Sequence, residues 1–394
     1  MIDKPRAVAE FLELVQIASL SKREGRIAKR LVATLEGLGV AAEIDDAGAR
    51  VEGETGNVLA RFPGSVPDAP PLLLCAHMDT VVPGENVRPV IDGDIVRTDG
   101  TTVLGGDDKA GIVAILEALR AAREHRVPHG PVDVLFTICE EMGLLGAKHF
   151  DVGRLRARHG LVLDCDGVFE LVTQAPAANR VDVVVHGREA HAGVCPEQGI
   201  SAIKVAAEAI AAMRLGRIDA ETTANLGLIQ GGMAVNIVPN RVSLRGEARS
   251  RSVEKLEAQT EHMRRCFEEA AARHRVSAGG REHAARVEAR VERDYERLDL
   301  SDETPIVRMV VEAATKLHRS LRTRATGGGC DANVLNGRGL EVANLGCGMR
   351  EIHTVNEWID LRDMIATAEL VLEVLRINAE HRGAWGARPG PPSF

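Results

Sequence analysis

The sequence contains no run of basic residues, no pair of cysteines spaced CxxC and no apolar stretch approaching the ~20 residues that cross a bilayer. Its net charge is −8 and its pI is about 5.9. Phosphate binding needs clustered Lys and Arg, so this balance argues against a nucleic-acid partner. The lack of a long apolar run likewise argues against insertion in a membrane.

The cysteines are scattered, at positions 75, 139, 165, 195, 266, 330 and 347. Their odd number and irregular spacing argue against a disulfide framework and against a cysteine-rich zinc site. We therefore expect a cytoplasmic protein whose metal ligands, if it binds metal, are His, Asp and Glu. The opening residues carry Asp3 and Glu10 among apolar side chains, which predicts an amphipathic helix rather than a signal peptide.

A length of 394 residues predicts two domains. Up to about residue 175, and again from about 303, short apolar strands alternate with helical periodicity, which predicts an α/β sheet with helices packed on it. Strands are expected at 72–77 and 132–138, and a helix at 111–125 after a Gly/Asp-rich loop. That loop therefore lies at the carboxyl edge of the sheet, where ligands of α/β folds bind.

The middle of the chain has a different pattern, which predicts a small inserted α+β domain with β-α-β-β-α-β order. Its expected elements are strands at 180–187, 236–249 and about 285–294, and helices near 199–213 and 252–274. We assign residues 178–295 to this domain, and 1–177 with 296–394 to the larger one. The tail at 382–394 is rich in Gly and Pro, so we expect it to be disordered and without a role.

Acids and histidines occur at five strand ends or adjoining loops, so they can converge on one rim of the sheet. They are His77 and Asp79 in CAHMDTV, Asp107 and Asp108 in GGDDKAG, Glu140 and Glu141 in TICEEMGLLGA, Asp164 and Asp166 in LVLDCDG, and His353 in REIHTVNE. Singly, several have structural explanations: Asp79 as a turn residue, or Asp107 or Asp108 as a helix cap. Adjacent carboxylates such as Glu140 and Glu141, however, repel unless a cation or a proton separates them.

These residue types suit Zn²⁺, or Mn²⁺ or Co²⁺ in a more oxygen-rich site. We take as metal ligands His77, Asp107, Glu141, Asp164 and His353. Three carboxylates and one hydroxide would carry four negative charges, which two divalent ions balance. The sequence therefore predicts two Zn²⁺ per chain.

In this order, the five motifs resemble those of the dinuclear-zinc peptidases of metallopeptidase family twenty, above all its peptidase T-like branch, over nearly the whole chain. The resemblance implies a catalytic domain with a central mixed sheet flanked by helices, and an inserted ferredoxin-like lid and dimerisation domain, hence a homodimer. It implies that Asp107 bridges the metals, with His77 and Asp164 on one and Glu141 and His353 on the other.

The resemblance also implies that Asp79 orients His77 and that Glu140 is the catalytic base. In the inserted domain, REAHAG matches a motif whose histidine, here His191, reaches the substrate carbonyl, often in the partner subunit's site. Asn236 matches a substrate contact and Arg249 an arginine that binds a substrate carboxylate. By the residues alone, His191 would be a surface histidine and Arg249 a solvated strand residue.

One position departs from the family pattern. GGGCDAN has Cys330 where Ser or Thr usually precedes the Asp, in a loop expected to contact substrate. The presence of Cys330 therefore puts the substrate specificity in doubt more than the hydrolytic reaction.

The expected function is hydrolysis of the amide bond of small peptides, as a tripeptide aminopeptidase. Metal ions lower the pKa of a water molecule, and Glu140 takes its proton and returns it to the departing amine. The alternative in the same chemistry is an N-acyl-amino-acid amidohydrolase or carboxypeptidase. Further hypotheses are a non-catalytic dimeric scaffold and a thiol nucleophile at Cys75, Cys139 or Cys165, although buried strand cysteines usually act as small hydrophobic residues.

Overall fold

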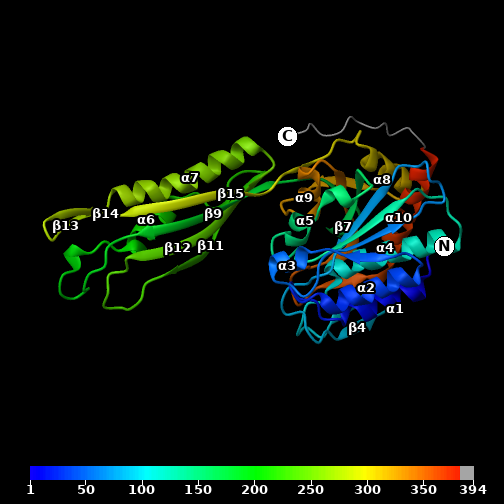
Figure 1. The fold of residues 1–394 in the computed structure, drawn as a ribbon, viewed down its shortest axis with the longest axis horizontal. Helices are drawn as coiled ribbons and strands as arrows, with labels where there is room; N and C mark the ends of the chain where they lie inside the picture. The colour runs from blue at the N-terminus through cyan, green and yellow to red at the C-terminus, as the bar shows by residue number, and fades with distance from the viewer. Residues whose placement is uncertain (382–394) are drawn as a thin grey trace. The chain divides into compact units, whose positions relative to one another are not determined.

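The computed structural model describes residues 1–381, which form two compact units (Figure 1). Unit 1 comprises residues 1–174, 298–326 and the described chain from residue 330 onward, and unit 2 comprises 175–297 with 327–329. Segment 382–394, expected to be disordered, lies outside the described residues. Within residues 1–381, no helix is long and apolar enough to span a bilayer.

Unit 1 is built on a mixed sheet whose centre is parallel. Strand β3 (Leu72–His77) pairs in parallel with β6 (Val132–Thr137) and β7 (His159–Asp166), and β7 pairs in parallel with β18 (Glu341–Arg350). The order across the sheet is β1-β2-β6-β3-β7-β18-β19-β5-β4. The outer strands are β1 (Ala42–Ile44), β2 (Val58–Phe62), β4 (Pro89–Asp92), β5 (Ile95–Thr98) and β19 (Trp358–Asp360). Strand β8 (Val168–Ala175) also pairs with β18, and β16 (Leu298–Asp299) and β17 (Arg322–Ala325) pair with β8.

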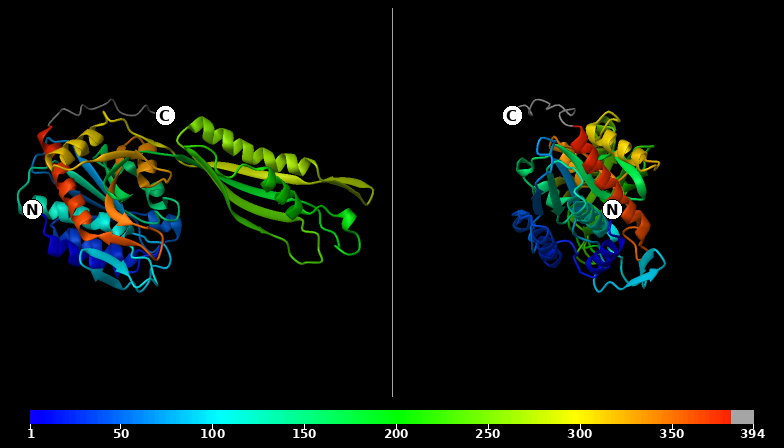
Figure 2. Two further views of the ribbon diagram at one scale, coloured as in Figure 1. Left: turned by 180° about the vertical axis from the view of Figure 1, so that it is seen from behind. Right: turned by 90° about the vertical axis from the view of Figure 1, so that its right-hand side faces the viewer.

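Helices flank this sheet (Figure 2), which confirms the predicted fold class. Helix α4 (Gly106–Glu124) packs against β3, β7 and β18, and its outer side is covered by α1 (Lys4–Val15) and α10 (Leu361–Glu380). This double coverage explains why nearly every residue of α4 is buried. The other helices are α2 (Gly25–Gly37), α3 (Ala47–Val51), α5 (Leu145–His149), the 3₁₀ turn η1 (Val152–Arg154), α8 (Pro305–Lys316) and α9 (Asp331–Gly337).

Unit 2 is an antiparallel sheet with two helices, and its longer elements follow the predicted β-α-β-β-α-β order. The strands at 216–217 and 222–231 and the hairpin at 275–284 were not located from the sequence. Its elements are β9 (Ala177–His186), the 3₁₀ turn η2 (Pro196–Gln198), α6 (Ala202–Ala212), β10 (Gly216–Arg217), β11 (Thr222–Gly231), β12 (Arg241–Ser250), α7 (Val253–Ala272), the hairpin β13 (Arg275–Ala278) and β14 (Arg281–Ala284), and β15 (Arg286–Tyr295). The strand order is β10-β11-β12-β9-β15. Alternate residues of β9 are buried, and Val181, Val183 and Val185 share a core with Phe267 of α7.

The predicted strand at 236–249 is wrong at its start, because β12 begins only at Arg241. Pro239 has no N–H with which to join a ladder. The preceding residues instead bond to neighbouring loops: Val238 N–H donates to Ala190 O, and Asn236 O accepts from Ala192 N–H, each at 2.9 Å. Asn236 therefore lies in a loop and not in a strand.

Candidate metal centre

The five predicted metal ligands all belong to unit 1 and come from five separate segments. His77 is the last residue of β3, and Asp164 lies near the end of β7. Glu141 follows β6, His353 follows β18, and Asp107 lies at the start of α4. The three central strands are parallel, so their carboxyl ends meet at one rim of the sheet, as in other α/β folds.

Asp107 lies between the two histidines. Its Oδ1 is 2.9 Å from His77 Nε2, and its Oδ2 is 3.2 Å from His353 Nε2. Asp164 Oδ1 is 3.7 Å from His77 Nε2, and Glu141 Oε1 is 2.8 Å from His353 Nε2. Three groups of donor atoms result, each within 4.8 Å: Asp107 with His77 and Asp164, Asp107 with Glu141 and His353, and His77 with Glu140 and Glu141.

The electrostatics of this cluster suit divalent cations. Burial raises the pKa of Asp164 to about 7, and the nearby charges of Asp107 and Glu141 add to the rise. Burial also raises the pKa of Glu140 well above its usual value, again with Asp164 contributing. Carboxylates crowded in this way carry a free-energy cost that cations remove, and imidazole with carboxylate is a donor set that Zn²⁺ accepts. The residues present therefore fit a metal centre.

Asp79 is fully buried and holds the turn that carries both glutamates. Its carboxylate accepts the backbone N–H of Glu140 at 2.9 Å and of Glu141 at 3.2 Å, as well as the hydroxyl of Ser21 at 2.6 Å. His77 Nδ1 is 3.0 Å from the main-chain oxygen of Asp79 and 3.4 Å from its carboxylate. Asp79 thus faces His77 while it fixes the position of the Glu140–Glu141 pair.

Neither acid of the GGDDKAG motif caps a helix. Gly105 occupies the N-cap position of α4, and Asp107 and Asp108 have non-helical φ and ψ angles. Asp108 is buried and accepts the backbone N–H of His77 at 3.1 Å. In the LVLDCDG motif, Asp164 joins the cluster, whereas Asp166 is exposed on the surface and does not.

Sequence reasoning missed several residues that support the centre. Glu24, which is fully buried, accepts the backbone N–H of Cys139 at 2.9 Å, directly before the glutamate pair. Glu357 accepts the N–H groups of Gly105 and Asp107. Glu357 could have been found, since it stands in the REIHTVNE motif, whereas nothing around Glu24 marks it in the sequence.

The cysteines of the strands are poor nucleophiles. Cys75 and Cys139 are fully buried and Cys165 nearly so, and all are free. Burial raises the pKa of Cys139 to about 12 and that of Cys75 well above its usual value. Because the thiolate is the reactive form, this disfavours a thiol mechanism.

Cys330 is also buried, in the loop expected to contact substrate. Its Sγ accepts from the side-chain amide of Asn344, which also donates to the main-chain oxygen of Asp164. The sulfur of Cys330 thus contacts Asn344, the side chain that binds the backbone of Asp164.

The three site residues predicted in the inserted domain all lie in unit 2, but at different places. His191 and Asn236 are exposed and adjacent, since a β-bridge joins His191 to residue 237. Arg249 lies near the far end of β12, where it pairs with Glu247 at 3.0 Å. It is eight residues beyond Arg241, about 26 Å at ~3.3 Å per residue.

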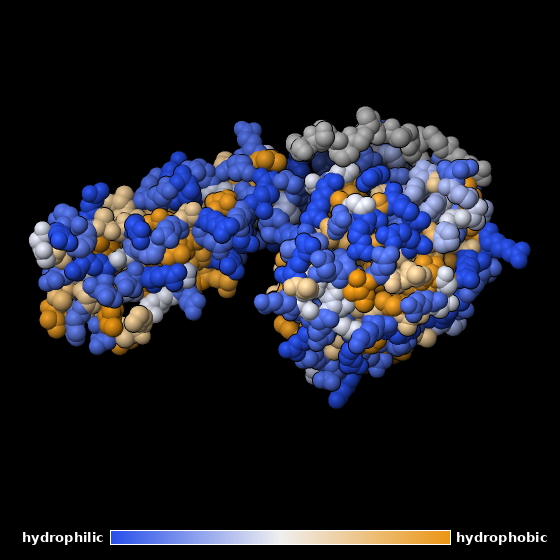
Figure 3. Space-filling view, in the orientation of Figure 1, coloured by the Kyte–Doolittle hydropathy of each residue, from blue (hydrophilic) through white to orange (hydrophobic). Residues whose placement is uncertain are grey.

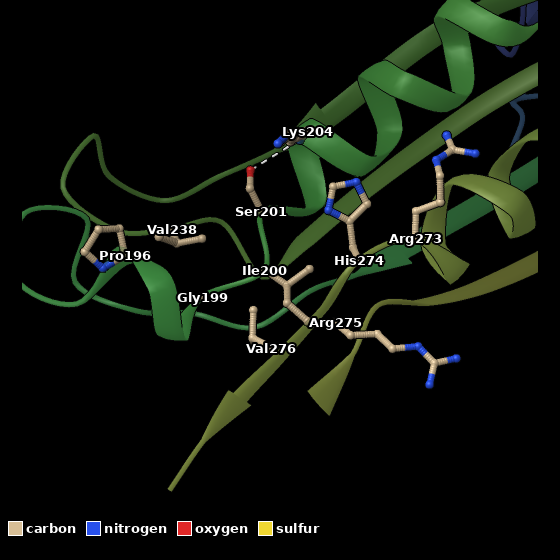
Figure 4. A pocket seen from close by; sticks show the side chains of 10 residues that line it. All are labelled: Pro196, Gly199, Ile200, Ser201, Lys204, Val238, Arg273, His274, Arg275 and Val276. Carbon is tan, nitrogen blue, oxygen red and sulfur yellow. Dashed lines mark hydrogen bonds between the residues drawn. The ribbon is translucent and has the colours of Figure 1, made fainter. Parts of the chain in front are cut away.

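Unit 2 also contains a pocket of about 300 Å³ (Figure 4). Its lining includes the cations Lys204, Arg273 and Arg275 together with apolar side chains, and no carboxylate. The lining also includes Ser201 and His274, but one histidine without a carboxylate is not a donor set that holds zinc or manganese. The pocket is not a second metal centre.

Comparisons with known proteins identify the family. The model of peptidase family M20/M25/M40 matches residues 73–377. The chain belongs to this family. YqjE of Bacillus subtilis (strain 168) is 42% identical over 381 residues, which cover 96% of this chain and 100% of YqjE.

Two solved structures are similar over nearly their whole length. Aminopeptidase PepT from Bacillus cereus ATCC 10987 has 41% identity and a TM-score of 0.85, with 96% of this chain and 99% of that chain covered. A tripeptidase from Staphylococcus aureus subsp. aureus Mu50 has 37% identity and a TM-score of 0.88, with 96% and 100% covered. The protein is thus a metallopeptidase of family M20/M25/M40, and the hypothesis of a non-catalytic scaffold is wrong.

Proposed function

We propose that this metallopeptidase is a cytoplasmic aminopeptidase that acts on tripeptides with two Zn²⁺ ions per chain. The observation that carries the proposal is the position of Asp107, whose two oxygens face the imidazoles of two separate donor groups. The similar aminopeptidase and tripeptidase support the substrate class. Seven free cysteines support a reducing compartment.

In this proposal His77, Asp107 and Asp164 hold one ion, and Asp107, Glu141 and His353 hold the other. When bound, the ions act as Lewis acids that polarise the substrate carbonyl and lower the pKa of water. Glu140 takes the proton from the attacking water and delivers it to the departing amine. Asp79 keeps Glu140 in place through its backbone N–H.

The substrate proposal predicts the products of a simple assay. With Ala-Ala-Ala and other tripeptides, we expect release of the free N-terminal residue and a dipeptide, detected by mass spectrometry. N-acetylated tripeptides and N-acetyl-amino acids serve as matched controls and are expected to react much more slowly. Faster hydrolysis of N-acetyl-amino acids would identify an acyl-amino-acid amidohydrolase, and release of the C-terminal residue would identify a carboxypeptidase.

We also propose that unit 2 forms a homodimer, with Asn236 and Arg249 contacting substrate and His191 reaching the substrate carbonyl. Three residues span about 10 Å at most. His191 lies in a loop beyond the Arg241 end of β12, and Arg249 lies about 26 Å from Arg241 along the strand. One tripeptide cannot reach both in the same chain, so His191 is proposed to serve the site of the partner.

The surface of β11 supports this assembly. Beyond Ala224, β11 pairs with no other strand on its outer side among the described residues. Leu228 and Ile229 are 62% and 59% exposed on this edge, and further exposed apolar residues follow in the next loop, Met233 and Val235. Figure 3 shows hydrophobic residues on the surface of unit 2. An unpaired apolar edge is a natural place for a second chain to add its strand.

Charge on this edge should separate the subunits. We expect the double substitution Leu228→Asp and Ile229→Asp to convert the dimer to a monomer in light scattering and to abolish peptidase activity. Val291→Asp, on β15 at the opposite edge, is the matched control and should leave the dimer intact. A wild-type monomer, or a charged variant that stays dimeric, would contradict the proposed interface.

Mixed dimers test the sharing of His191 directly. His191→Ala and Arg249→Ala homodimers should each be nearly inactive, because every site lacks one of the two side chains. After the two variants are unfolded and refolded together, each mixed dimer should regain one complete site. If mixing restores no activity, the two residues do not come from different chains.

A further inference from the structure

Glu357 is buried in unit 1 and uses both carboxylate oxygens on one backbone turn. It is 2% exposed. Its Oε2 accepts the N–H of Gly105 at 2.8 Å, and its Oε1 accepts the N–H of Asp107 at 3.0 Å. The two N–H groups bind different oxygens, so in a Gln side chain one of them would face an NH₂ group, which cannot accept. A glutamate at position 357 therefore suits the two backbone N–H groups that face it.

The other end of Glu357 belongs to the segment that carries His353. That segment is bound internally: Glu357 N–H donates to Thr354 O at 3.1 Å, and the Thr354 hydroxyl donates to Glu351 O at 2.8 Å. Glu351 and His353 have φ angles of +50° and +63°, which non-glycine residues rarely adopt without support from neighbours. The side chain of His353 is also 51% exposed, so little packing holds it.

Glu357 thus connects two segments more than 240 residues apart in the sequence, as its bonds to Gly105 and Asp107 show. One segment presents Asp107 Oδ2 and the other presents His353 Nε2, 3.2 Å from each other. We infer that Glu357 is a positioning residue that holds the Asp107 turn against the His353 segment and so sets the geometry of the donor group of Asp107, Glu141 and His353. The hydrogen bonds of the Glu357 carboxylate go to backbone N–H groups and not to the histidines of the proposed centre.

The inference rests on the proposed metal centre. Zinc titration of the metal-free protein tests the metal centre and the positioning role of Glu357 separately. Wild type, Glu357→Gln and Glu351→Gln are compared by calorimetry. Glu351 is the matched control because it lies in the same segment with an exposed side chain. For Glu357→Gln we expect one of the two binding steps to weaken by about 10- to 100-fold, as for other residues that support metal ligands. Glu351→Gln should bind zinc as the wild type does.

The outcomes are distinct. If wild type binds no zinc, the proposed centre fails. If wild type binds two ions and Glu357→Gln binds them with unchanged affinities, only the positioning role is wrong. A lower melting temperature of the metal-free variant with unchanged zinc affinities likewise shows a merely structural role. Should Glu357→Gln not fold, Glu357→Asp keeps the charge but is too short for both bonds, and a weakened step is again expected.

Discussion

Replacing Glu140 with Gln is expected to lower kcat for a tripeptide by about 10³-fold, within the usual contribution of general acid–base catalysis. The amide keeps the shape of the side chain but cannot take a proton from water. In the metal-free protein, burial and the charge of Asp164 raise the pKa of Glu140. Measurement of kcat and of metal content by mass spectrometry on the same sample checks the prediction.

The neighbouring residue is the matched control. Glu141→Gln replaces a carboxylate that lies 2.8 Å from His353 Nε2 with a neutral amide, which is a weaker metal ligand, so we expect the variant to lose metal as well as activity. Glu140→Gln should retain the wild-type metal content. Because His77, Glu140 and Glu141 also have donor atoms within 4.8 Å, the opposite result would assign the ligand role to Glu140. If Glu140→Gln retains full activity, Glu140 is not the general base.

Removal of metal is expected to have the second largest effect. A chelator should abolish activity, and added Zn²⁺ should restore it. Each ion that is present at about a thousand times its dissociation constant stabilises the folded protein by about 4 kcal/mol. Loss of the ions should therefore lower the free energy of unfolding by several kcal/mol, which thermal unfolding with and without chelator measures. Unchanged activity after complete chelation would exclude a metal mechanism.

The metal-free protein should also become less stable as the pH rises. The pKa of Asp164 is raised to about 7 by burial, and that of His353 to about 10 by its bonds to Asp107 and Glu141. Between the unfolded and folded pKa values of each group, the folded state binds more protons, so stability falls with rising pH. For Asp164 this window runs from about 4 to about 7, and for His353 from about 6.5 to about 10. Metal-free protein should therefore melt at a higher temperature at pH 5 than at pH 8, and the metal-bound protein should depend less on pH.

The pattern along the chain predicted the alternation of strands and helices in both units, but it did not locate β10, β11 or the β13–β14 hairpin. Continuous apolar runs at 72–77 and 132–138 could be recognised as buried strands because both faces of a central parallel strand are covered. Alternation at 180–187 likewise indicated a strand with one covered face. The start of β12 was missed because Asn236 and its neighbours look like a strand until Pro239 is considered.

The sequence by itself determined which acids and histidines follow the parallel strands and so lie near the rim. Position at a strand end alone did not separate Asp164, which joins a donor group, from Asp166, which is exposed and joins none. Only the tertiary structure decided which histidine each carboxylate oxygen of Asp107 faces. Asp107 faces His77 with one and His353 with the other because Glu357 holds its backbone from about 250 residues away. Such long-range hydrogen bonds depend on packing and leave no periodic signal along the chain.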